Sequence, residues 1–118
     1  MNFDKYPEIK KAYKKYNSLQ NKLANIQNKI EVANANNDSS LQKEFRAVFN
    51  EIEDYIDVFA KIIYDSLSKL RPSLYNIRTK TISTWDEIVI NKDEFLKDKN
   101  NCRLLVGLIT GVGLYRIK

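Results

Sequence analysis

The chain has 118 residues, of which 43% are hydrophobic and 30% charged, with a formal net charge of +5. These values are typical of one folded domain and argue against a disordered chain. The absence of histidine excludes Ser–His and Cys–His nucleophile pairs and histidine-ligated metals, and the single cysteine, Cys102, excludes an intramolecular disulfide and a structural zinc site.

An apolar seven-residue repeat runs through residues 1–35. It consists of two rows, the second lying three residues further along than the first: Ile9, Tyr16, Leu23 and Ile30, then Ala12, Leu19, Ile26 and Ala33. Residues with this spacing line the seam of a helix that packs against another helix. The sequence therefore predicts a long helix over about residues 7–35, which the asparagine-rich stretch 34–38 ends.

A second long helix is predicted over about residues 40–70. Ser39, three residues before Gln42, forms a capping-box pattern at its start, and Arg71–Pro72 marks its end. Its apolar positions form one broad face: Phe45, Ile52 and Phe59; Phe49, Ile56, Ile63 and Leu70; Val48, Tyr55 and Ile62; Ala60 and Leu67. This face covers roughly 160° of the helix surface, which is more than one partner helix can bury.

The two predicted helices carry opposite charge. Residues 1–35 hold seven basic and three acidic residues, a net charge of +4, whereas residues 36–70 hold four basic and seven acidic residues, a net charge of −3. A row of lysines lies beside the first seam, and some of the acidic residues of the second helix can face it: Lys15, Lys22 and Lys29, and Glu51, Glu53, Asp54 and Asp57. We therefore predict an antiparallel hairpin with complementary charges.

Residues 72–118 predict a small α+β segment. A short helix or a strand is expected near residues 79–97, and the capping-box pattern of Thr84 and Glu87 favours the helix. Residues 98–101 are predicted as a turn. Residues 103–117 are predicted as a β-hairpin broken at Gly111, against the alternative of a helix with small residues at positions 107 and 111.

Taken together, these elements predict a mainly α fold. It is expected to form a single domain, 1–118, with a long helical hairpin over residues 1–71. A C-terminal packing and binding segment, residues 72–118, is expected to cover the broad face of the second helix, because no linker rich in glycine, serine or proline separates it.

Basic residues supply the candidate anion-binding positions. One set alternates with tyrosines near the N-terminus, and a second is spread over the last third of the chain: Lys10, Lys11, Lys14 and Lys15; Arg71, Arg78, Lys80, Arg103 and Arg116. Lysine neutralises phosphate, tyrosine can stack on bases, and arginine suits bidentate phosphate contacts. In a strand, Arg78 and Lys80 would share one face. An ordinary solvated basic surface remains the favoured interpretation of both sets.

Apolar and acidic residues supply the other candidates. The interface candidates lie on the broad face of the second helix and at the one tryptophan: Val48, Tyr55, Ile62 and Trp85. Glu53 and Asp57, four residues apart, could hold Mg²⁺ or act as acid and base, but pairing with lysines is the favoured interpretation. No glycine pattern for phosphate binding is present, so no cofactor or metal is predicted.

The sequence favours a non-catalytic, self-associating helical binding protein over an enzyme. It would form a dimer or a higher homo-oligomer and act on a protein partner as an adaptor, a chaperone or an inhibitor. The alternative is a basic protein that sequesters nucleic acid or a nucleotide signal. A phage is one source that fits this alternative, since frequent Asn, Lys and Ile indicate an AT-rich genome. A cytoplasmic, non-membrane protein is expected, because no secretory signal or membrane-length apolar run is present.

In general form, the pair of long helices resembles small helical-hairpin chaperones and bacteriocin-immunity bundles. That resemblance rests on the helices alone, and a shared fold does not by itself give a shared function.

Overall fold

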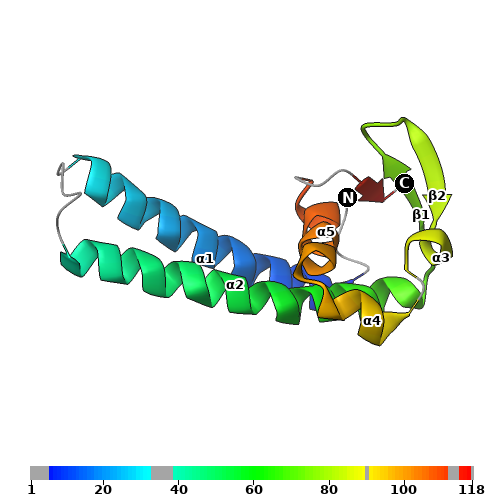
Figure 1. Ribbon diagram of the computed structural model, residues 1–118, viewed down its shortest axis with the longest axis horizontal. Helices are drawn as coiled ribbons and strands as arrows, with labels where there is room; N and C mark the ends of the chain where they lie inside the picture. The colour runs from blue at the N-terminus through cyan, green and yellow to red at the C-terminus, as the bar shows by residue number, and fades with distance from the viewer. Residues whose placement is uncertain (1–5, 33–38, 90, 112–114, 118) are drawn as a thin grey trace.

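The computed structural model describes residues 6–32, 39–89, 91–111 and 115–117. Two long helices lead the chain, and short helices and strands follow: α1 Pro7–Val32, α2 Ser39–Ser68, β1 Ser73–Asn76, β2 Thr81–Thr84, α3 Trp85–Ile88, α4 Lys92–Lys97, α5 Lys99–Thr110 and β3 Tyr115–Ile117. The predicted mainly α class is confirmed, because α1 and α2 pack together as a long hairpin and a small antiparallel sheet follows (Figure 1).

The seam of α1 packs against α2 as the repeat predicts. The buried residues of α1 all come from the two rows: Ile9, Ala12, Leu19, Ile26 and Ile30. Tyr16 and Leu23, from the same rows, are half-buried against the core. Residues 33–38, where the sequence predicts the end of the helix, lie outside the described residues.

The second helix ends slightly before the predicted residue 70. Its last helical residue is Ser68, and the N–H groups of Leu70 and Arg71 both donate to the carbonyl oxygen of Leu67, at 3.0 and 2.7 Å. Arg71 takes a left-handed backbone conformation with φ of 47°. Pro72 follows, and the two residues together turn the chain away from the helix axis.

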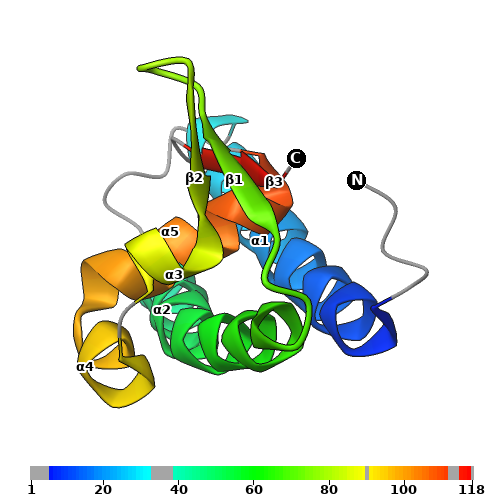
Figure 2. The same ribbon diagram turned by 90° about the vertical axis from the view of Figure 1, so that its right-hand side faces the viewer.

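The C-terminal segment packs on the C-terminal half of α2. Figure 2, which looks along the hairpin from its base, shows α1 and α4 on opposite sides of α2, with α5 above it. Tyr64 of α2 contacts Trp85 and Phe95, with ring centroids 5.7 and 6.1 Å apart. In this half of α2, the broad apolar face is therefore covered from two sides, as its width requires.

The region of residues 79–97 contains both a strand and helices. β1 pairs antiparallel with β2, with Ser73 opposite Thr84, and the sheet order is β2-β1-β3. The predicted capping box is present, since the backbone N–H of Thr84 donates to the Glu87 carboxylate at 3.1 Å. Asn91 caps α4 by accepting from the N–H groups of Asp93 and Glu94.

The predicted β-hairpin at residues 103–117 is wrong. Residues 99–110 form α5 instead, which is the helical alternative, and β3 pairs antiparallel with β1 rather than with residues 104–110. The predicted turn at 98–101 is the start of α5, where Asp98 accepts from the N–H of Asn100 at 2.9 Å. Gly111, with φ of 78°, ends the helix by donating to Gly107. Residues 112–114 lie outside the described residues.

The expected pairing between the lysine row of α1 and the acidic residues of α2 is also corrected. Among the described residues, the ion pairs of Glu53 and Asp57 are with α5: Arg103 lies 2.9 Å from Glu53, and Lys99 lies 3.9 Å from Glu53 and 3.0 Å from Asp57. Lys15 instead sits over the Tyr55 ring, 4.9 Å from its centroid. The docking of α5 brings closer cations to these carboxylates than α1 provides.

Candidate interaction surface

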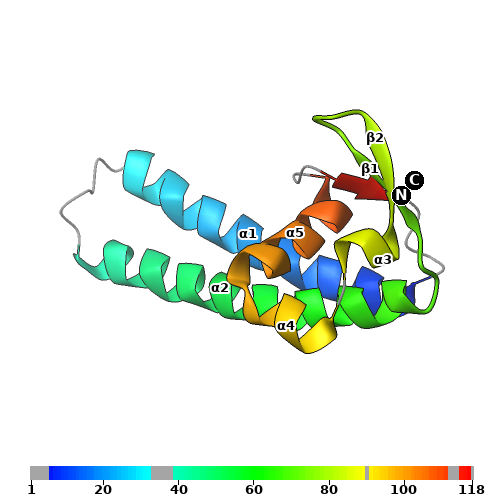
Figure 3. The ribbon, with the colours of Figure 1, turned by 45° about the vertical axis from the view of Figure 1, so that its right-hand side comes forward.

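One half of the hairpin projects beyond every other element. We refer to residues 21–32 of α1 and 39–52 of α2 as the arm. In Figure 1 and Figure 3, α4 and α5 lie over the base of the hairpin and leave the arm as two helices alone. The ion pairs of α5 with α2 begin at Glu53, at the end of the arm. Within the described ranges, α1 and α2 are therefore the elements that bury the apolar residues of the arm.

Exposure along one row of α2 shows where the cover stops. Phe49, Ile56 and Ile63 are seven residues apart and share a side of the helix, but they are 45%, 6% and 0% exposed. Ile56 and Ile63 follow Glu53, where the ion pairs of α2 with α5 begin, whereas Phe49 precedes it and lies in the arm. Phe49 is thus nearly half exposed although the later residues of its row are buried. The apolar packing around Phe49 is therefore incomplete.

Phe49 belongs to a short apolar stripe on the arm. Leu41, Phe45 and Phe49 are four residues apart, so they lie on one side of α2, and we refer to them as the arm stripe. Leu41 and Phe45 are partly buried against the core. The charges around them are mixed, because the arm holds four basic and three acidic residues: Lys22, Lys29, Lys43 and Arg46, and Glu31, Glu44 and Glu51. Their net charge is only +1.

The predicted interface residues are not gathered on one surface. Val48 and Trp85 are each 3% exposed, so they belong to the core of this chain. Tyr55 and Ile62 are half-buried and line a depression of about 370 Å³ beside α1. Sequence reasoning included Phe45 and Phe49 among the broad-face rows but did not single them out, because no pattern within α2 indicates which part of a row α5 covers.

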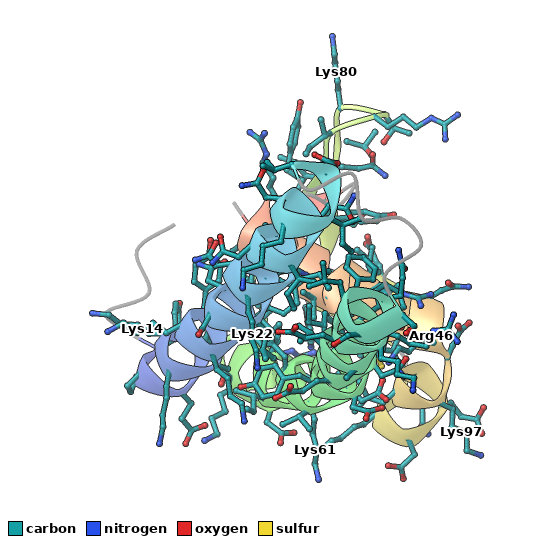
Figure 4. The ribbon with its side chains drawn as sticks, turned by 90° about the vertical axis from the view of Figure 1, so that its left-hand side faces the viewer. Lys14, Lys22, Arg46, Lys61, Lys80 and Lys97 are labelled. Carbon is teal, nitrogen blue, oxygen red and sulfur yellow. The ribbon has the colours of Figure 1, made fainter. Side chains whose placement is uncertain are left out.

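The predicted anion-binding residues are dispersed as well. Arg71 forms an ion pair with Asp86, and Arg103 forms one with Glu53. Arg116 lies on β3 at the sheet, and the four lysines of the N-terminal set lie on α1. In Figure 4, the labelled basic side chains from α1, α2, α4 and the β1–β2 turn point in different directions around the molecule. The structure therefore does not bring the predicted set together.

Arg78 and Lys80 do not share a strand face. Both lie in the turn between β1 and β2, and Lys80 has a left-handed backbone with φ of 57°. The Asn76 side chain organises this turn by accepting from the N–H groups of Arg78 and Thr79, at 2.9 and 3.1 Å. Asparagine commonly bonds to the backbone two residues further on in this way, which favours a turn over a longer strand.

Several chemical groups that the sequence singled out are engaged in packing or pairing. Within the ranges that the structure describes, no group of three or more His, Cys, Asp or Glu residues could hold a metal ion. Cys102 is buried, its thiol donates to the Leu96 carbonyl oxygen at 3.4 Å, and burial raises its pKa. Of the helices in those ranges, none combines the length and the apolar character that crossing a membrane requires.

Comparison with protein-family models, curated proteins and solved structures finds no match in any of the three. The arm stripe and the depression beside Tyr55 and Ile62 are therefore the observations that bear on its function.

Proposed function

We propose that this protein is a non-catalytic helical binding protein that self-associates, with the arm stripe of one copy packed against the arm stripe of a second. The exposure of Phe49, next to buried Ile56 in the same row, is the observation that carries this proposal. Burying apolar surface of this kind is the main driving force of association.

A second copy is the occupant that suits the arm. The two helices of one hairpin bury only the faces that they turn toward each other. Two hairpins packed together can enclose a four-helix core. In a twofold-symmetric contact each arm offers the same surface, so the apolar stripe of one copy meets an apolar stripe. Mixed charges with a net charge of +1 keep the repulsion between two arms small.

The oligomer would act on a protein partner, as an adaptor, a chaperone or an inhibitor. Pairing of the arms leaves the base of each hairpin accessible, where Tyr55 and Ile62 line a depression beside α1. An aromatic residue and an aliphatic residue at a concave site favour contact with an apolar side chain of a partner.

The experiment compares two aspartate substitutions on α2. Phe49→Asp places a charge in the arm stripe, and Val58→Asp places one nine residues further on, on the opposite side of the helix at about 100° per residue. The two native side chains are similarly exposed, at 45% and 52%, so neither substitution opens the core. Because association depends on concentration, light scattering is measured at about 50 μM.

The expected result is a dimer or higher oligomer for the unsubstituted protein and for Val58→Asp, and a monomer for Phe49→Asp with an unchanged helical circular-dichroism spectrum. A monomeric unsubstituted protein at this concentration would refute self-association. Equal dissociation by both substitutions would show that the arm stripe is not the contact.

A further inference from the structure

A groove of about 550 Å³ lies between α1 and α5, with Ile56 of α2 among its lining residues. It is distinct from the arm stripe, because none of the three residues of the arm stripe lines it. Its volume is within the range of small-molecule sites, roughly 300–1,000 Å³. The groove is larger than the depression beside Tyr55 and Ile62, which measures about 370 Å³.

Two matching helical stripes build the groove. α1 contributes residues 13, 16, 17 and 20, and α5 contributes residues 103, 106, 107 and 110. Each set has the i, i+3, i+4, i+7 spacing of one helix face, so each stripe extends about 10 Å along its axis. Gly107 has no side chain to fill the space between the helices, and the α1 stripe carries polar residues where a packed helix pair would have apolar ones.

The walls combine aromatic rings with hydrogen-bonding groups. The Tyr16 ring packs against Phe59 at 5.6 Å, which holds it in place, and its hydroxyl oxygen accepts from Gln20 at 3.0 Å. The Tyr16 O–H can therefore still donate to a ligand. The Thr110 hydroxyl donates to the Val106 carbonyl oxygen at 3.0 Å and keeps lone pairs that can accept.

Arg103 supplies the charged group of the groove. Its guanidinium is half exposed, and one nitrogen donates to Glu53 at 2.9 Å, which fixes the side chain at the groove. Guanidinium has five N–H donors in a planar fork that matches a carboxylate or a phosphate. Two cations and two carboxylates meet here, since Lys99 pairs with Glu53 and Asp57. The charges balance, so the site suits an anion of low charge rather than a polyanion.

We propose that this groove binds a planar aromatic molecule carrying one acidic group, with the ring beside Tyr13 and Tyr16 and the acid on Arg103. The aromatic walls supply apolar contact and stacking, and the fork of Arg103 orients the acid. The acid is a carboxylate or a phosphate monoester. A site of this kind gives the nucleotide-binding alternative a defined place on the molecule, and it does not depend on self-association.

Two-dimensional ¹⁵N NMR titration of the full chain tests this proposal. The probes are indole-3-acetate, which has a ring and a carboxylate, AMP, which has a ring and a phosphate, and indole, which has the ring alone. We expect saturable shifts at the amides of Tyr16, Gly107 and Thr110 with at least one acidic probe, and binding about tenfold weaker for indole. The acid preferred, carboxylate or phosphate, is read from the first two probes.

Three variants locate the binding. Arg103→Gln is expected to weaken the binding of the acidic probes about tenfold and to leave the binding of indole unchanged. Asn17→Trp, at an exposed position on the rim, fills the groove without altering the core and is expected to abolish binding of all probes. Arg46→Gln, on the arm, removes an equal charge away from the groove and is expected to change nothing.

Three results would overturn the proposal. The first is the absence of groove shifts with both acidic probes at about 5 mM, well above the dissociation constant of even a weak small-molecule site. The second is that Arg103→Gln weakens the binding of indole and of the acidic probes equally, while the melting temperature of the protein is unchanged. The third is undiminished binding to Asn17→Trp, which would place the ligand elsewhere.

Discussion

Lys80 occupies a backbone conformation that glycine adopts more readily. Its φ of 57° is in the left-handed region, where a side chain crowds the backbone. It closes the turn between β1 and β2, and its N–H donates to the Asn76 carbonyl oxygen at 2.8 Å. The sequence offers no glycine here, so the turn is held by the Asn76 side chain and by strand pairing.

We expect Lys80→Gly to raise the free energy of unfolding by about 0.5–1 kcal/mol, because it removes this crowding. Arg78→Gly is the matched control in the same turn: position 78 is not among the positive-φ residues, so glycine there only adds freedom to the unfolded chain and should lower stability. Urea unfolding of both variants checks the prediction. A loss of stability in Lys80→Gly would contradict it.

Burial of weak acids predicts lower stability at alkaline pH. Desolvation raises the pKa of Cys102 above its ordinary 9.0, and that of Tyr55 and of Tyr64 above 10.0. The folded chain then keeps protons that the unfolded chain releases, so these groups leave the free energy of unfolding unchanged below pH 9. The free energy falls as the pH rises through the raised values.

Urea unfolding at pH 7, 9 and 10 measures this fall. In Cys102→Ala the fall should begin at higher pH, because the ordinary pKa of the tyrosines, 10.0, is above that of the cysteine. Native Cys102 should also react slowly with a disulfide reagent and quickly once unfolded, since the thiolate is the reactive form. Stability that rises from pH 9 to 10 would show that other groups dominate.

The start of α5 depends on one side chain. Asp98 accepts from the N–H of Asn100, while the backbone N–H groups of Asn101 and Cys102 bond to its carbonyl oxygen. Residues 98–101 look like a turn in the sequence, because asparagine and aspartate favour both turns and helix N-caps. The burial of those residues after Asn101 that form the buried side of α5 favours the helix N-cap over the turn.

Asp98→Ala should therefore lower the free energy of unfolding by about 1 kcal/mol, as loss of an N-cap commonly does. Asp98→Asn keeps the cap and is expected to retain most of that stability. Thermal unfolding of both variants distinguishes the cap from the charge. If Asp98→Asn loses as much stability as Asp98→Ala, the carboxylate stabilises the helix through its charge instead.

At the scale of the whole molecule, the cover of α2 divides the protein into a packed base and an open arm. Local stability should follow this division, because regions with few buried contacts open most easily. In monomeric Phe49→Asp, backbone amides of residues 45–52 should exchange with solvent faster than those of residues 56–63. Hydrogen exchange read by NMR measures both sets.

The same experiment on the unsubstituted protein at high concentration should show slower exchange in the arm, because packing against a second copy covers it. Val58→Asp should exchange like the unsubstituted protein. Equal exchange in the arm of Phe49→Asp and of the unsubstituted protein would contradict pairing of the arms.

Sequence reasoning located the two long helices because their apolar periods are long and regular. It placed residues 103–117 in a β-hairpin, because a short apolar run fits a buried strand or a buried helix, and Gly107 and Gly111 weaken a helix. The groove was also missed as a site. Tyr16 and Arg103 both appear in the sequence patterns, but nothing in the sequence indicates that α1 and α5 lie side by side.

By itself, then, the sequence determined the hairpin, its seam and the surplus apolar width of α2, because these depend on spacing within one helix. The tertiary structure decided what covers that width. α4 and α5 bury it at the base, where α5 also pairs with Glu53 and Asp57, and Phe49 in the arm stays 45% exposed. Which part of α2 is covered depends on contacts between residues far apart in the chain, and the periodicity of one helix does not predict such contacts.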